Sequence, residues 1–148
     1  DKVEICDTDI ADNRTANIII ASYFSTNYYN TRGVAANYNP YPKAIYVHDN
    51  RLKGGGDSPD GLKLKALKTA MYGLGGNFPD VLWDGYVDTK NLVDGLPPAN
   101  DRICIRGVNG VINADGPHDY KNPSKDMKPY ECTLPSLPPV TLNPEPKV

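Results

Sequence analysis

Short runs of alternating apolar and polar residues, separated by turn residues, dominate the first third of the chain. In residues 3–13, apolar side chains alternate with polar ones on both sides of a turn at residues 7–9. Residues 18–20 are all isoleucine, which is typical of a strand buried on both faces. We expect three short strands in about 20 residues, enough for one turn of a stacked coil.

The same pattern recurs 42 positions later. Apolar and bend positions agree together between residues 3–13 and 45–55, in four pairs: Val3 with Ile45, Ile5 with Val47, Asp7 with Asp49, and Ile10 with Leu52. This offset is about twice an ordinary solenoid rung of roughly 20 residues, so residues 23–43 must loop out of the stack. We therefore predict an all-β fold in which residues 1–55 form terminal rungs of a right-handed parallel β-helix, a solenoid.

One helix is predicted near residues 59–73. Ser58 is a candidate N-cap, Pro59 suits the first helical position, and the glycines from Gly73 end the segment. Four apolar residues share one face: Leu64, Leu67, Met71 and Leu74. We expect this face to cover the open end of the stack, where unpaired strand edges need protection.

Residues 56–148 as a whole are predicted to be a helix-bearing, loop-rich C-terminal cap. From residue 135 onward, five of fourteen residues are proline, so this tail is expected to be extended along the surface or disordered.

Charge and hydropathy exclude several classes of partner. The 16 basic and 18 acidic side chains give a net charge of -2, so no basic surface for nucleic acid is expected. The longest apolar run, residues 18–21, is far short of the roughly 20 residues that span a bilayer. The chain opens directly on a strand-like segment, from which we infer a processed or truncated N-terminus with preceding rungs missing.

The three cysteines lack the spacings of zinc, haem or thioredoxin-type sites. Cys104 and Cys132 bracket a segment rich in Pro, Gly and Asn with little obvious core, and a disulfide between them is predicted. Cys6 is left over and is expected to be a buried or half-buried thiol that behaves as a small hydrophobe.

Candidate chemistry in the sequence is sparse. Asp7 and Asp49 are expected at equivalent bends, either as a carboxylate pair on a sugar-binding face or as bend caps bonded to the backbone. His48-Asp49 and His118-Asp119 would need to meet to form a metal or acid–base site, and nothing in the sequence brings them together. We predict no catalytic residue, metal or cofactor.

Tyrosines gather in the excursion at residues 23–43, among Asn and Ser. Such residues serve protein-binding and sugar-binding surfaces, although they also pack loops onto a core. The candidate binding surface consists of Tyr23, Tyr28, Tyr29, Tyr38 and Tyr41.

Several longer runs resemble the C-terminal part of bacterial parallel β-helix repeat-containing proteins. The likeness covers nearly the whole chain and is carried by residues 17–23, 41–50, 54–57, 83–85, 102–105 and 132–135, of which the Tyr-Pro-Lys-Ala-Ile-Tyr-Val-His-Asp-Asn run at 41–50 is the most specific. The resemblance implies an exported protein, encoded beside a diheme c-type cytochrome, without defined catalytic residues. Cys104 and Cys132 match the family pattern, whereas Cys6 falls at a position expected to be polar.

The sequence therefore predicts a non-catalytic extracytoplasmic scaffold or binding module: periplasmic, secreted or an outer-membrane lipoprotein. Expected partners are an exported diheme c-type cytochrome, another protein subunit or a carbohydrate. The alternative is a carbohydrate-active enzyme, lyase-like or hydrolase-like, with most of its site in missing N-terminal rungs.

Overall fold

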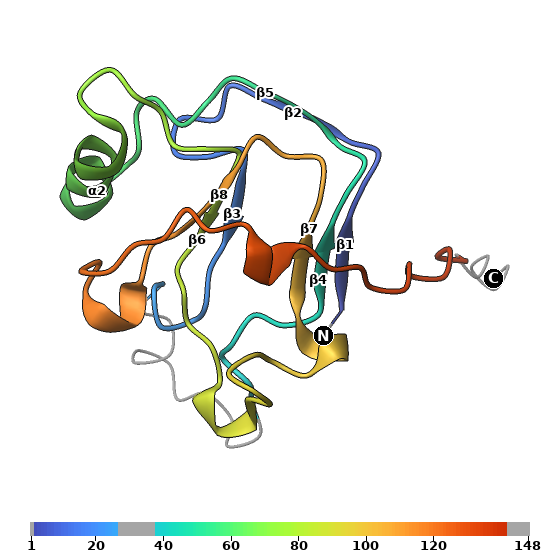
Figure 1. Ribbon diagram of the computed structural model, residues 1–148. Coiled ribbons are helices and arrows are strands. Elements are labelled where there is room, and N and C mark those ends of the chain that lie inside the picture. The colour runs from blue at the N-terminus through green and yellow to red at the C-terminus, as the bar shows by residue number, and fades with distance from the viewer. Residues whose placement is uncertain (1, 27–37, 142–148) are drawn as a thin grey trace, which may run out of the picture.

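The computed structural model describes residues 2–26 and 38–141. In this part of the chain, eight strands of three residues each form three small parallel sheets. The first sheet contains β1 (Val3–Ile5), β4 (Ile45–Val47) and β7 (Ile103–Ile105); the second contains β2 (Asp9–Ala11) and β5 (Arg51–Lys53); the third contains β3 (Ile18–Ile20), β6 (Val81–Trp83) and β8 (Val111–Asn113). Figure 1 shows the first and third sheets on opposite sides of the core, with β2 and β5 along the top.

The pairing register inferred from the sequence repeat is confirmed. β1 and β4 are parallel neighbours with Val3 opposite Ile45, and β2 and β5 are parallel neighbours with Ile10 opposite Leu52. The two copies of the pattern therefore lie side by side, 42 residues apart. The sheets also continue beyond residue 55, because β6, β7 and β8 join them.

The expected all-β fold class, a right-handed parallel β-helix solenoid, is wrong. The described residues show short parallel strands in three small sheets without solenoid closure, together with one α-helix and four short 3₁₀ helices. The physical reason is that a repeat present twice specifies the pairing of neighbouring strands only. Each strand is three residues long, and the intervening loops decide how the sheets are placed.

The α-helix, α2 (Leu62–Tyr72), is shorter at its start than the predicted 59–73. Gly61 precedes it with a φ of 84°, which is not helical, so Pro59 stays outside the helix. Gly73, with a φ of 78°, ends the helix as predicted, and its N–H donates to the carbonyl of Thr69.

Two apolar clusters hold these elements together. There are two because successive residues of a strand point to opposite faces of its sheet. The larger cluster lies between the sheets and comprises Ile18, Ile20, Val47, Val81, Trp83, Ile103, Ile105, Val111 and Tyr130. The smaller cluster joins α2 to the other face of the third sheet and comprises Ala16, Leu67, Phe78, Leu82, Ile112 and Ala114. Instead of covering the open end of a stack, α2 therefore packs on a sheet face, on the left in Figure 1.

The C-terminal part crosses the outer face of the first sheet. After η4 (Lys128–Tyr130), Cys132 forms the predicted disulfide with Cys104 of β7, with a Cα–Cα distance of 5.0 Å. Farther along, the N–H of Leu137 donates to Glu4 of β1 at 2.7 Å. Residues 131–141 carry no regular secondary structure and run along the surface, on the right in Figure 1.

No helix within residues 2–26 and 38–141 has the length and apolar character needed to cross a bilayer.

Candidate binding site

A buried carboxylate holds the start of the excursion in place. Asp84, directly after β6, accepts hydrogen bonds from the N–H and hydroxyl of Ser22 at 2.6 and 2.7 Å and from the hydroxyl of Ser25 at 2.7 Å. Asp84 and Ser22 are both buried. This network connects the excursion to the third sheet, because it joins the ends of the neighbouring strands β3 and β6.

The structure places three of the five candidate tyrosines at one surface. Tyr23 and Tyr38 make an edge-to-face contact with their ring centroids 4.9 Å apart, and both are exposed. The ring of Tyr41 packs on that of Phe24, with the ring centroids 5.3 Å apart. Tyr28 and Tyr29 lie outside the described residues.

Three pockets adjoin one another around residues 38–43. The first, here called the polar pocket, has a cavity volume of about 60 Å³ and lies between residues 39–43 and residues 87–101. The tyrosine pocket, about 230 Å³, is lined by Tyr23, Tyr38 and Tyr41. The third, the indole pocket, is about 160 Å³. Pro42 lines all three, so they form one contiguous region.

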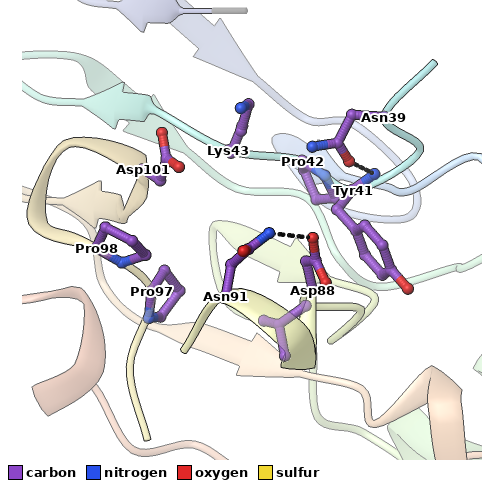
Figure 2. A pocket seen from close by; sticks show the side chains of 10 residues that line it. Asn39, Tyr41, Pro42, Lys43, Asp88, Asn91, Pro97, Pro98 and Asp101 are labelled. Carbon is purple, nitrogen blue, oxygen red and sulfur yellow. Dashed lines mark hydrogen bonds between the residues drawn. The ribbon is translucent and has the colours of Figure 1, made fainter. Parts of the chain in front are cut away.

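The polar pocket combines acidic, amide and ammonium groups, as Figure 2 shows. Asp88 lies before η1 (Thr89–Asn91), and its carboxylate accepts from the side-chain amide of Asn91 at 2.7 Å. Lys43 and Asp101 lie on the other side, and neither of their charged groups has a hydrogen-bond or ion-pair partner among the described residues. The pocket therefore offers one free donor group and one free acceptor group to a ligand.

The indole pocket is mainly apolar. The rings of Trp83 and Tyr130 line it and are perpendicular, with their centroids 5.7 Å apart. Leu92 and Leu96 also line this pocket. Trp83 is 7% exposed, and its indole N–H is buried without a hydrogen-bond partner in residues 2–26 and 38–141. A buried unpaired donor costs about 1–3 kcal/mol.

A separate cluster lies on the outer face of the first sheet. His48 follows β4, and its Nε2 is 2.8 Å from Glu4 Oε1 while its Nδ1 is 2.7 Å from Asp49 Oδ2. Cys6 adjoins them as the free cysteine, half-buried. Donor atoms of Glu4, Cys6 and His48 lie within 4.8 Å of one another, so these three residues could hold a metal ion.

The surroundings shift the pKa of all three residues of this cluster. Hydrogen bonds to the carboxylates of Asp49 and Glu4 raise the pKa of His48 above its usual value. The hydrogen bond that Glu4 accepts from the Leu137 N–H lowers the pKa of Glu4, and the hydrogen bond with His48 lowers it further. Desolvation and the nearby charge of Glu4 raise the pKa of the Cys6 thiol, which disfavours the thiolate that a nucleophile requires.

Neither prediction for Asp7 and Asp49, a carboxylate pair or a pair of bend caps, describes these residues fully. Both occupy left-handed bends, with φ of 50° and 51°, as equivalent bend residues should. The hydrogen bonds that join the two bends come from Asn50, which accepts from Thr8 N–H at 3.2 Å and donates to the carbonyl of Ile5 at 2.8 Å. The side chain of Asp49 instead pairs with His48.

The two histidines belong to different clusters, because His118 pairs with Asp115 at 2.6 Å. The Glu4–Cys6–His48 cluster was missed in the sequence. The repeat contained the necessary signal, because the offset of 42 places Cys6 opposite His48.

Comparisons of the chain with models of protein families, with curated proteins and with solved structures give no match. The resemblance to β-helix repeat-containing proteins, and the cytochrome partner it implies, therefore stay predictions.

Proposed function

We propose that the chain is a non-catalytic extracytoplasmic binding module that recognises a carbohydrate at the three contiguous pockets around residues 38–43. The observation that carries this proposal is the pairing of a free ammonium and a free carboxylate, Lys43 and Asp101, in one small pocket beside exposed tyrosines. A sugar hydroxyl both donates and accepts hydrogen bonds, so it satisfies both groups at once.

The aromatic lining supports the same ligand class. Tyrosine rings provide contact area at low entropic cost, and Tyr38 and Tyr41 border the polar groups. The adjoining indole pocket adds the side chains of Trp83 and Tyr130 to this lining. Ligand pockets combine apolar walls with a few polar groups in this way.

An extracytoplasmic location is supported by the Cys104–Cys132 disulfide, because such bonds persist in oxidising compartments.

The test is titration of the protein with a panel of neutral and uronic-acid oligosaccharides. Trp83 is the only tryptophan in the chain, so its fluorescence reports directly on the indole pocket. We expect a saturable change for at least one oligosaccharide, confirmed by calorimetry. Lys43→Ala and Asp101→Asn should each weaken binding about 10-fold, the equivalent of one charge-assisted hydrogen bond.

Lys65→Ala is the matched control, because Lys65 is an exposed residue of α2, and no α2 residue lines any of the three pockets. The proposal fails if no oligosaccharide binds, or if the Lys43 and Asp101 variants bind as tightly as the unmodified chain. Release of shortened or unsaturated products from a bound polysaccharide would show catalysis and contradict the non-catalytic assignment.

A further inference from the structure

The cluster of Glu4, Cys6 and His48 is separate from the proposed carbohydrate site and is built by the strand register. β1 and β4 pair with Glu4 opposite Tyr46, and the pairing continues past the strand ends because His48 N–H donates to the carbonyl of Ile5 at 3.1 Å. Cys6 is therefore the neighbour of His48 across the two strands. Since side chains alternate, Glu4, Cys6 and His48 all lie on the outer face of the first sheet.

We propose that Glu4, Cys6 and His48 form a binding site for Zn²⁺, with Oε1, Sγ and Nε2 as the ligand atoms. Thiolate, imidazole and carboxylate are the three ligand types that zinc takes from proteins, whereas Ca²⁺ and Mg²⁺ prefer oxygen ligands alone. One ligand atom from each of the three residues lies within 4.8 Å of the other two, and Nε2 of His48 is 2.8 Å from Oε1 of Glu4. In a tetrahedral zinc site two ligand atoms are about 3.3–3.6 Å apart, so small side-chain rotations suffice.

His48 and Glu4 each have a hydrogen-bond partner on the atom that would not bind zinc, which leaves the proposed ligand atom available. Asp49 occupies Nδ1 of His48 at 2.7 Å, which leaves Nε2 for the metal. This carboxylate–histidine arrangement is the usual support for a zinc-bound imidazole. The Leu137 N–H occupies Oε2 of Glu4 at 2.7 Å, which leaves Oε1.

The surroundings restrict the imidazole further. The ring of Tyr46 contacts that of His48 in a tilted arrangement, with centroids 4.1 Å apart and an interplanar angle of 31°, and Tyr46 itself is buried. The side chains of His48 and Glu4 are 14% and 13% exposed, so the site is sheltered but open to solvent on one side. Pre-oriented, partly desolvated ligands lose little entropy when they bind a metal.

Zinc binding displaces the proton shared between Nε2 and Oε1, and the thiol of Cys6 loses its proton as the Zn–S bond forms, so that both protons are released to solvent. Three protein ligands leave the fourth tetrahedral position for a water molecule.

The experiment is calorimetric titration of the untagged full chain with Zn²⁺, together with the absorption spectrum of the Co²⁺-loaded protein. We expect one Zn²⁺ per chain and a thiolate-to-cobalt charge-transfer band. Cys6→Ser and His48→Gln should weaken Zn²⁺ binding more than 100-fold. Asp49→Asn should weaken it about 10- to 100-fold, the usual effect of losing a partner of a ligand histidine.

His118→Gln is the matched control, because His118 also pairs with a carboxylate but belongs to no group of potential metal ligands among the described residues. This variant should bind Zn²⁺ as tightly as the unmodified chain. A second measurement avoids variants altogether. Cys6 is the one free cysteine of the chain, so alkylation reports on it alone, and Zn²⁺ should slow its alkylation at least 10-fold. The proposal is overturned if Zn²⁺ does not bind, if Cys6→Ser binds it equally well, or if Zn²⁺ leaves the alkylation rate unchanged.

Discussion

Asp115 illustrates how single residues stabilise the tight turns of this chain. It adopts a left-handed conformation before η3 (Gly116–His118), with a φ of 58°. Its carboxylate accepts from Asn122 N–H at 3.0 Å and pairs with Nδ1 of His118 at 2.6 Å. Desolvation alone would raise the pKa of this carboxyl, but the contacts from His118 and Asn122 outweigh it, and the pKa is lowered.

Asp115→Asn should therefore destabilise the protein in a pH-dependent way. A lowered folded-state pKa gives stabilisation that is present above the unfolded pKa of about 3.9 and is lost as the pH falls through the folded value. We expect a loss of about 1 kcal/mol at pH 7 and a much smaller difference near pH 3. Urea unfolding at the two pH values measures it.

Asp94→Asn is the control, because Asp94 also has a left-handed φ, 51°, but its side chain is exposed. Asparagine adopts this conformation as readily as aspartate, so backbone strain is equal in the two variants. An equal loss in both variants, or a loss at position 115 that does not depend on pH, would contradict the role of the carboxylate.

At the scale of elements, α2 illustrates how tertiary contacts select among residues that look alike in the sequence. Four apolar residues were predicted on one helix face, yet they end in different environments. Leu67 is 5% exposed in the cluster with Leu82 and Ile112, Leu64 and Met71 pack partly against that cluster, and Leu74 lies beyond the helix end at 89% exposure.

Leu67→Ala should lower the free energy of unfolding by about 2–5 kcal/mol, because it removes buried methyl groups and leaves a cavity. Leu74→Ala should change it by about 0.5 kcal/mol or less. Both values come from chemical denaturation monitored by circular dichroism. Similar effects at the two positions would mean that α2 does not pack on the third sheet through Leu67.

At the scale of the whole molecule, the disulfide joins the C-terminal part to the first sheet. Cys104 is completely buried in β7, and Cys132 follows η4, 28 residues later. The segment that leaves Cys132 reaches Glu4, so the disulfide also helps to keep the Leu137 N–H at the proposed zinc site.

Replacing both Cys104 and Cys132 with alanine should lower the free energy of unfolding by about 3–4 kcal/mol on a loop-entropy model. Thermal and denaturant unfolding with and without a thiol reductant measure this. Reductant should destabilise the unmodified chain and leave the double variant unaffected. A reductant effect of equal size on both proteins would show that the disulfide is not its target.

Local pattern was enough for several features, because each depends on residues close in sequence or on a direct match between two segments. The alternating residues of the two copies determined the parallel register of Val3 with Ile45 and of Ile10 with Leu52. Helical spacing and the glycine at 73 determined the existence and end of α2. Cys104 and Cys132 were paired correctly because they bracket a segment rich in Pro, Gly and Asn that has little core of its own.

Only the tertiary structure decided the fold class, the packing of α2 and the residues that complete the pockets around Pro42. Three-residue strands bury too few side chains for their pattern to specify how sheets are placed, so the β-helix prediction failed. The pockets around Pro42 join residues 38–43 to residues 87–101. Such contacts arise from the path of the intervening loops, because the separation of two segments along the chain does not determine the distance between them in the folded protein.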